Sequence, residues 1–241
     1  MSVQEAVESW ADVTPATVIN RPSARAWRDS KPFQSRMIQS LGFDYPETLV
    51  TTDPEAAMRF WEKHKKVIYK SLSGVRSIVS CLTPGHRKRF ADLRWCPTQF
   101  QEYVPGTEFR VHVIGESVFA GEIVSDAVDY RYAENQGLSA GIRAAKLPPR
   151  ISERCRQLAS AMKLLAAGID LRRTPDGRWY CLEVNTSPGF TYFDDDDKHP
   201  IANEIARVLM NDNPIRTGGR GVAKRRLKRL RKSGPGIRRG S

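Results

Sequence analysis

Three oxygen-bearing side chains stand in one predicted hairpin that is otherwise largely apolar. The sequence Thr-Pro-Asp-Gly at 174–177 is typical of a tight turn, so the segments on either side should be antiparallel strands. A four-residue turn pairs Asp170 with Cys181 and puts Glu183 on the diagonal. Because side chains alternate along a strand, Asp170, Glu183 and Asn185 should share one face. The opposite face takes four aliphatic side chains: Ile169, Leu171, Leu182 and Val184.

Oxygen donors gathered in this way indicate a hard divalent cation. Two carboxylates repel each other unless positive charge lies between them, and all-oxygen coordination suits Mg²⁺. The alternative is a solvated outer face of the hairpin. Trp179 and Cys181 are expected on the same face as the carboxylates, which argues that the face is at least partly covered. The hairpin by itself leaves both interpretations open.

Lys70 is a second candidate for chemistry, in the strand pattern K-V-I-Y-K-S at 66–71. It shares a strand face with Ile68, which is unusual for a lysine that only points to water. The following loop at Ser73-Gly74 could place backbone N–H groups against phosphate oxygens. The alternative is a lysine at the end of a strand, beside an ordinary turn.

Two further polar groups lie near a break in the chain at Pro105-Gly106. Glu102 and Tyr103 precede this break, where a chain passing between lobes could present its N–H and C=O groups to a planar base. After the break, three polar residues alternate with apolar ones and line one strand face: Glu108, Arg110 and His112. The alternative is a solvated strand face, with His112 as a face residue rather than a base.

The elements that must position these residues follow from periodicity and turn signals. Helical spacing predicts helices at 33–41, at 54–64 behind the N-cap Asp53, at 151–167 and from 199 to 209. Extended patterns predict strands at 48–51, 67–71, 78–79 and 100–104, and a hairpin at 108–123 around Gly115-Glu116. Residues 1–30 and about twenty-five residues after 123 look irregular. This order predicts an α+β fold of two lobes with mostly antiparallel sheets, which meet near residues 100–107.

The composition of the 241-residue chain is that of a soluble globular protein, with 40% hydrophobic and 27% charged residues. No apolar run is long enough to span a membrane, and Glu5, Glu8 and Asp12 stand where a signal peptide would be basic and then apolar. Four widely separated cysteines without a C-x-x-C pair favour neither a disulfide framework nor a zinc site. A reducing cytoplasm is therefore the expected compartment.

The formal net charge of +12 is concentrated at the C-terminus. Residues 214–241 hold eleven Lys or Arg side chains and no acid, which leaves a net charge of only +1 for residues 1–213. This basic tail is rich in glycine and poor in apolar residues, so it is expected to be disordered and to contact RNA or another polyanion. A solvated extension without a specific partner is the alternative.

The succession of these motifs resembles the ATP-grasp superfamily. It consists of the strand lysine Lys70, Q-E-Y-V-P-G at 101–106, E-F-R at 108–110, and G-I-D-L at 168–171 closing on L-E-V-N-T-S-P-G at 182–189. Within the superfamily, the motifs are most similar to the ribosomal-protein glutamate ligases and ribosomal-peptide maturases. The resemblance runs from about Asn20 to Met210. It implies two α+β lobes with ATP between them, and ligation of a carboxylate to a nucleophile through an acyl-phosphate.

Carried over position by position, the resemblance implies nucleotide contacts. Lys70 would contact the ATP phosphates, Lys31 would be the family's earlier lysine, and Glu108 would bind the ribose hydroxyls. The hinge beside adenine would be formed by Gln101, Glu102, Tyr103 and Val104. Arg131 stands where the family has an arginine near the reacting phosphate.

The same carry-over makes Asp170, Glu183 and Asn185 the ligands of Mg²⁺, with Mn²⁺ as an alternative ion. The chain departs from the family in three places. Only about twenty residues precede Asn20, so part of the acceptor-binding surface is expected to be absent or supplied elsewhere. Tyr132-Ala133 and a lone Gly137 follow Arg131, where relatives often have Ser-Asn and a glycine pair. The basic tail has no counterpart that we recognise in the family.

These observations divide the chain into a shortened N-terminal segment, a first lobe, a second lobe with the metal site, and the basic tail, at residues 1–30, 31–105, 106–212 and 213–241. The implied function is an ATP- and Mg²⁺-dependent ligase that joins a carboxylate, on a peptide or protein, to an amine or hydroxyl. Such a reaction needs no protein nucleophile. Two other classes stay open: an ATP-binding module that no longer ligates, and an RNA- or ribosome-associated factor that acts through the tail.

Overall fold

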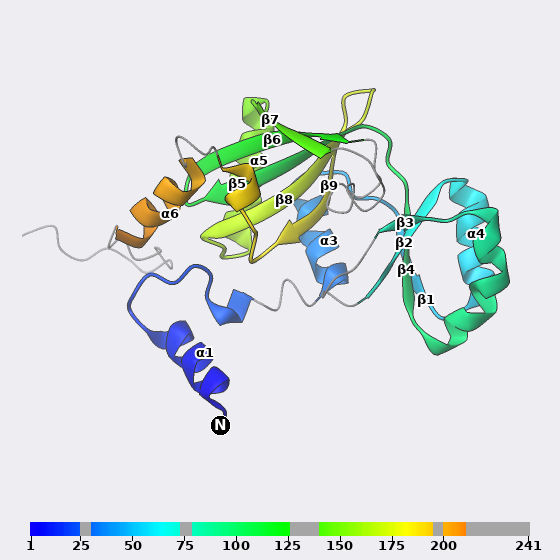
Figure 1. Cartoon of the computed structure of the whole chain (residues 1–241), viewed down its shortest axis with the longest axis horizontal. Coiled ribbons are helices and arrows are strands. Elements are labelled where there is room, and N and C mark those ends of the chain that lie inside the picture. The colour runs from blue at the N-terminus through cyan, green and yellow to red at the C-terminus, as the bar shows by residue number, and fades with distance from the viewer. Residues whose placement is uncertain (25–29, 73–78, 126–139, 195–199, 211–241) are drawn as a thin grey trace, which may run out of the picture.

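The computed structural model describes residues 1–24, 30–72, 79–125, 140–194 and 200–210, and it contains two β-sheets with helices packed against them (Figure 1). The smaller sheet has the strand order β1-β4-β2-β3, and the larger sheet has the order β7-β6-β5-β8-β9. All of these neighbouring strands are antiparallel. The α+β class with antiparallel sheets is therefore confirmed.

Local sequence signals account for most of the smaller sheet. Its strands are β1 (Thr48–Thr51), β2 (Val67–Ser71), β3 (Ser80–Cys81) and β4 (Thr98–Glu102). Helix α4 (Pro54–His64) begins where predicted, because the Asp53 carboxylate accepts a hydrogen bond of 2.8 Å from the Glu55 N–H. The strand predicted at 78–79 is wrong in position, since Val79 precedes β3 and Ile78 lies outside the described residues.

The two faces of the smaller sheet differ in character. Phe60 of α4, Phe100 of β4 and Phe90 of the 3₁₀ helix η2 (Pro84–Trp95), which the sequence pattern did not predict, pack together in its core. Since side chains alternate, the opposite face carries Ile68, Lys70, Gln99 and Gln101. Lys70 therefore points away from the core of its own sheet.

The larger sheet contains the predicted hairpins and one further strand. Its strands are β5 (Thr107–Ile114), β6 (Ser117–Ser125), β7 (Ala140–Ala145), β8 (Ala166–Arg173) and β9 (Trp179–Asn185). The hairpin around Gly115-Glu116 is confirmed, with Ile114 opposite Ser117. Strand β7 lies in a stretch that was expected to be irregular, because its Ala-Gly-rich sequence carries no clear alternation.

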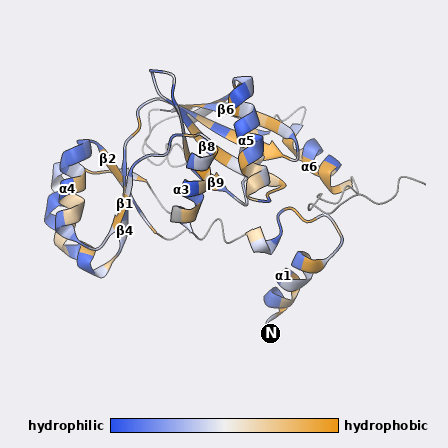
Figure 2. Ribbon diagram, turned by 180° about the vertical axis from the view of Figure 1, so that it is seen from behind, coloured by the Kyte–Doolittle hydropathy of each residue, from blue (hydrophilic) through white to orange (hydrophobic). Residues whose placement is uncertain are grey.

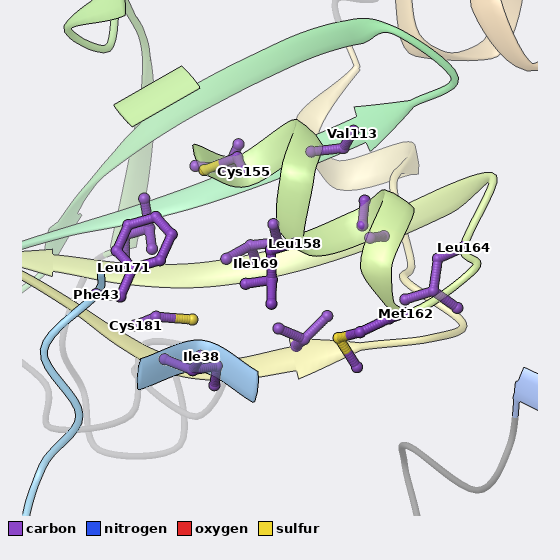
Figure 3. Close-up of a cluster of buried hydrophobic side chains, with 14 of the residues drawn as sticks. Ile38, Phe43, Val113, Cys155, Leu158, Met162, Leu164, Ile169, Leu171 and Cys181 are labelled. Carbon is purple, nitrogen blue, oxygen red and sulfur yellow. The ribbon is translucent and has the colours of Figure 1, made fainter. Parts of the chain in front are cut away.

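Helices α3 (Lys31–Ser40) and α5 (Pro149–Ala161) close the main hydrophobic core against the larger sheet. Figure 3 shows Ile38 of α3 and Leu158 of α5 gathered around Ile169 of β8. The helix predicted to continue to residue 167 ends at Ala161, which corrects the prediction. Its last apolar residues begin β8 instead, since a short apolar run suits a buried strand as well as a helix.

The register of the β8–β9 hairpin also differs from the prediction. Cys181 pairs with Leu171 and not with Asp170 as predicted, which corresponds to a loop of five residues, 174–178, rather than four. A β-bulge between Asp170 and Leu171 then shifts the pairing, so that Asp170 lies directly opposite Glu183 instead of diagonal to it. Such a bulge inserts one extra residue on one strand, so side chains on either side of it no longer follow the same alternation between the two faces.

The bulge moves two side chains to the opposite face from the predicted one. Cys181 is fully buried in the main core, and Trp179 packs against the same core. Leu182, predicted for the aliphatic face, is only half-buried and is not part of that core. The face that carries Asp170 and Glu183 is therefore more polar than the sequence pattern suggested.

The remaining elements lie near the two ends of the described chain. They are α1 (Val3–Val13), the 3₁₀ helices η1 (Pro22–Ala24) and η5 (Thr191–Phe193), and α6 (Pro200–Met210). Helix α6 was predicted, whereas α1 falls in a stretch expected to be irregular and buries none of its residues. Figure 2 shows α1 standing apart from both sheets. In the described part of the chain, every helix is too short or too polar to cross a bilayer.

Candidate functional site

The polar face of the larger sheet places a row of charged residues across three neighbouring strands. Arg110 of β5 is opposite Asp170 of β8, and Asp170 is opposite Glu183 of β9. Residues in such a row are about 5 Å apart from strand to strand. The structure therefore brings together Asp170 and Glu183, two of the three predicted metal ligands.

Glu183 is the point at which separate elements meet. The ammonium group of Lys31, at the start of α3, donates a hydrogen bond to Glu183 Oε1. The Lys70 Nζ atom, which comes from β2 of the other sheet, lies 3.7 Å from Glu183 Oε2. Both predicted lysines thus converge on one carboxylate, and the pair with Lys70 bridges the two sheets.

Asp170 is paired with a cation that the sequence reasoning did not place in the site. The Arg110 guanidinium donates a hydrogen bond of 2.6 Å to Asp170 Oδ1, and the Arg110 side chain is only 9% exposed. Gly168 leaves room for it, since a Cβ at that position would lie 2.8 Å from Arg110 NH2. The alternative of a solvated strand face is therefore wrong for Arg110, although its alternation on β5 was predicted.

The segment after Asn185 is held over the same face of the sheet. The Asn185 Oδ1 atom accepts a hydrogen bond of 2.9 Å from the Ser187 N–H, and His112 Nε2 lies 3.1 Å from the Gly189 carbonyl oxygen. With a carbonyl as its partner, this ring nitrogen is the donor. Burial, followed by the positive charge of Arg110, lowers the pKa of His112 to about 4. A neutral imidazole at pH 7 anchors this segment.

The predicted hinge residues lie where the chain leaves β4. Gln101 is buried, and its Nε2 donates to Thr48 Oγ1 at 2.9 Å. The N–H groups of Glu102 and Tyr103 donate to the carbonyls of Glu47 and Lys66, at 3.0 and 3.1 Å. These two N–H groups are already used in the backbone network, so the other main-chain groups of the hinge are better candidates for contacting a base.

Glu108 and the hinge are connected by Arg172, another residue that the sequence reasoning missed. The Arg172 guanidinium donates to Glu108 Oε2 and, at 3.0 Å, to the carbonyl oxygen of Val104. The Arg172 and Glu108 side chains are 12% and 21% exposed. The signal was present in the sequence, because Arg172 is two residues from Asp170 on the same strand face.

The donor set fits a hard cation on chemical grounds. Asp170, Glu183 and Asn185 offer only oxygen from their carboxylate and amide groups, and both carboxylates already attract positive charge from protein side chains. Among the described residues no group of three or more His, Cys, Asp or Glu side chains is suited to a metal, so the asparagine would be needed as a third ligand. Arg131 and the Ser73-Gly74 loop lie outside the described residues.

Comparison with known protein families identifies the family to which this chain belongs. The model of the RimK-like ATP-grasp domain matches residues 30–209. The chain belongs to the RimK-like ATP-grasp family. The resemblance read from the motifs is thereby confirmed, and so is the ATP-grasp fold.

Two solved ATP-grasp ligases illustrate how similar known structures are to this chain. A RiPP-associated ATP-grasp ligase from Chryseobacterium gregarium, solved with ADP and a leader and core peptide, is 25% identical with a TM-score of 0.77, and the alignment covers 88% of this chain and 68% of that one. The ATP-grasp ligase PsnB, solved with a precursor variant, Mg and ADP, is 30% identical with a TM-score of 0.68, covering 80% and 62%.

Sequence comparison with curated proteins finds similarity to a ligase. The D-alanine–D-alanine ligase of Aquifex aeolicus (strain VF5) is 29% identical over an alignment of 175 residues, and the alignment covers 67% of this chain. This chain spans only 59% of the length of that relative.

Proposed function

We propose that this ATP-grasp protein is an ATP- and Mg²⁺-dependent ligase that joins a peptide carboxylate to an amine or hydroxyl through an acyl-phosphate. The observation that carries the proposal is the convergence of Lys31 and Lys70 on Glu183, opposite Asp170. Two lysines from different sides and an acidic pair are the charges needed to bind a nucleotide triphosphate together with its metal ion.

In the proposed site, each group has a separate task. Lys31 and Lys70 bind phosphate oxygens of ATP, and Arg131 meets the reacting phosphate. Glu108 binds the ribose hydroxyls, and Arg172 keeps it beside Val104 of the hinge. Asp170, Glu183 and Asn185 hold Mg²⁺, and the same oxygen donors would accept Mn²⁺. The metal ion neutralises charge on the phosphates when it is bound.

The reaction itself needs no nucleophile from the protein. A carboxylate oxygen of the substrate attacks the γ-phosphorus of ATP, the bond to ADP breaks, and an acyl-phosphate forms. An amine or hydroxyl then attacks the acyl carbon, loses its proton, and releases phosphate. The lysines and Arg110 stabilise negative charge during these steps, and the neutral His112 keeps the segment 186–190 in place.

The kind of substrate is inferred from relatives. The Chryseobacterium ligase was solved with a leader and core peptide and PsnB with a variant of a minimal precursor, which supports a peptide or protein as the carboxylate donor. The four cysteines are free thiols, which supports a reducing, ATP-supplied compartment and hence a cytoplasmic location. Helix α3 packs on β9, so we propose that residues 31–47 belong structurally with the second lobe, although they precede the first in sequence.

Nucleotide products test this proposal. With ATP, Mg²⁺ and acidic peptides, the enzyme should release ADP and phosphate, and hydroxylamine should trap the activated carboxylate as a hydroxamate. Release of AMP instead would exclude the acyl-phosphate route. Nucleotide binding without any phosphate release would favour the alternative, an ATP-binding module that does not ligate.

The basic tail supports a second, separable activity. Eleven cations within residues 214–241 favour contact with RNA or another polyanion, by which the protein would associate with ribosomes or nucleic acid. Binding of the full chain to RNA, compared with a chain ending at Asn213, tests this part of the proposal. Equal affinities would remove the tail from it.

A further inference from the structure

Strand β9 carries Glu183 and Asn185 and lies at the edge of the larger sheet, where, among the described residues, no second strand pairs with it apart from a single bridge between Asp44 and Tyr180. Between these two residues, both main-chain polar groups of Val184 bond to one side chain. The Gln34 Nε2 donates to the Val184 carbonyl at 2.9 Å, and the Val184 N–H donates to Gln34 Oε1 at 3.0 Å. The Gln34 residue is only 3% exposed.

A carboxamide that accepts from an N–H and donates to a C=O of the same residue reproduces what a neighbouring strand would supply. The Val184 side chain is buried in the main core on the opposite face from the metal ligands. Val184 is therefore fixed from both sides, through its side chain and through its backbone. This leaves the adjoining Cα–Cβ bonds of Glu183 and Asn185 little freedom to change direction.

Helix α3 delivers this contact together with an ion pair. Lys31 is three residues before Gln34, on the same helical face, and it pairs with Glu183. Ile38, one turn further along, is fully buried in the main core and anchors the helix. One helix face thus contacts a metal ligand, the backbone beside it and the core.

We propose that Gln34 is a positioning residue, which holds the edge strand so that Glu183 and Asn185 point to a common metal ion. The inference rests on the proposed role of these two residues as metal ligands. A contact of this kind behind a metal ligand typically affects metal affinity by about 10- to 100-fold.

Other hydrogen bonds hold the rest of β9 in place, so loss of the Gln34 side chain should disturb only the strand around Val184. The Asp44 N–H donates to the Trp179 carbonyl at 3.1 Å, and the Cys181 N–H donates to the Asp44 carbonyl at 2.9 Å. Pairing with β8 continues along the strand from Arg173 to Gly168. The strand should therefore remain in the sheet when only the contact at Val184 is removed.

The experiment uses Gln34→Leu, which removes both hydrogen bonds at nearly constant volume, and Gln39→Leu as a control on the exposed side of the same helix. Nucleotide binding is titrated calorimetrically at increasing Mg²⁺ and, separately, in EDTA. Gln34→Leu should raise the Mg²⁺ concentration for half-maximal binding at least about tenfold, while affinity in EDTA changes less than twofold. Gln39→Leu should match the wild type in both.

Gln34→Glu provides a second measurement if Gln34→Leu does not fold. It keeps the acceptor for the Val184 N–H but loses the donor to the carbonyl, so its Mg²⁺ requirement should also rise. A lower melting temperature with an unchanged Mg²⁺ requirement in the variants would overturn the inference and make Gln34 merely structural. A wild-type protein without Mg²⁺-dependent nucleotide binding would instead overturn the proposed function.

Discussion

At the scale of single residues, the site is organised by charge compensation. Glu183 is paired with Lys31 and Lys70, and Asp170 is paired with Arg110. A divalent ion that takes these carboxylates as ligands competes with the cations for the same oxygens. The released ammonium groups are then available to phosphate, so metal binding and phosphate binding should depend on each other.

Replacing Glu183 with glutamine should separate metal binding from phosphate binding. Without the carboxylate, Lys31 and Lys70 are no longer held by it, so ATP binding in EDTA should tighten by about tenfold, which is the scale of one charge-assisted hydrogen bond. Mg²⁺-dependent turnover should fall by orders of magnitude. Glu153→Gln, which removes an exposed ion pair on α5, is the matched control. Weaker ATP binding in EDTA would contradict the proposed competition.

His112 makes stability depend on pH. Its folded pKa of about 4 lies below the ordinary value of 6.5, so between these values the unfolded chain binds more protons than the folded one. The free energy of unfolding should therefore fall as pH drops from 6.5 to 4, by up to about 3 kcal/mol from this residue. Denaturant titrations of His112→Gln should show this part of the slope removed. An unchanged slope would mean that folding does not lower the pKa of His112.

At the scale of elements, the hinge and the end of β8 must approach closely. Gly106 has φ +148°, and a Cβ there would lie 2.2 Å from the Arg173 carbonyl oxygen. This close approach accompanies the hydrogen bond between Arg172 and the Val104 carbonyl. Glycine at this position therefore allows Glu108, the proposed ribose ligand, and the hinge to be held together.

Alanine at position 106 should separate these two segments. A clash with backbone cannot be relieved by a rotamer change, so Gly106→Ala should lower the free energy of unfolding by about 3 kcal/mol and weaken nucleotide binding. Gly177→Ala is the control, since its φ of +86° is strained but its Cβ would meet nothing within 4 Å. It should cost about 1 kcal/mol and leave binding unchanged. Urea denaturation measures the stability of the two variants, and calorimetry measures their nucleotide binding. Equal effects of Gly106→Ala and Gly177→Ala on both quantities would argue against a special role for Gly106.

At the scale of the whole molecule, the described site and the basic tail are separate parts of the chain. All site residues proposed above lie before Asn213, so deletion of residues 214–241 should leave ATP affinity within about twofold of the full chain. Affinity for RNA should be largely lost and, in the full chain, should fall steeply with salt, as counterion release requires. Loss of folding on truncation would instead show that the tail packs on the body.

The sequence by itself determined those features that depend on neighbouring residues. The starts of α4 and α6, the strands β1 and β2, and the turn at Gly115-Glu116 follow from caps, prolines and alternation within a few positions. The motif spacing also indicated the family and brought Lys31, Lys70, Asp170 and Glu183 into one hypothesis. The structure pairs Lys31 and Lys70 with Glu183, and Arg110 with Asp170, and it sets the two carboxylate residues opposite each other on neighbouring strands.

Only the tertiary structure decided the register of the β8–β9 hairpin, the burial of Arg110 and the contact of Gln34 with β9. The one-residue bulge at Asp170/Leu171 turns Cys181 into the core and sets Asp170 opposite Glu183. No local sequence pattern reveals this bulge, because the register that it sets is stabilised by packing of the hairpin against the core. Arg110 is buried because Gly168, 58 positions later in the chain, leaves space above the sheet. Gln34 bonds to Val184 across 150 positions, a contact created by the docking of α3 and therefore absent from any sequence window.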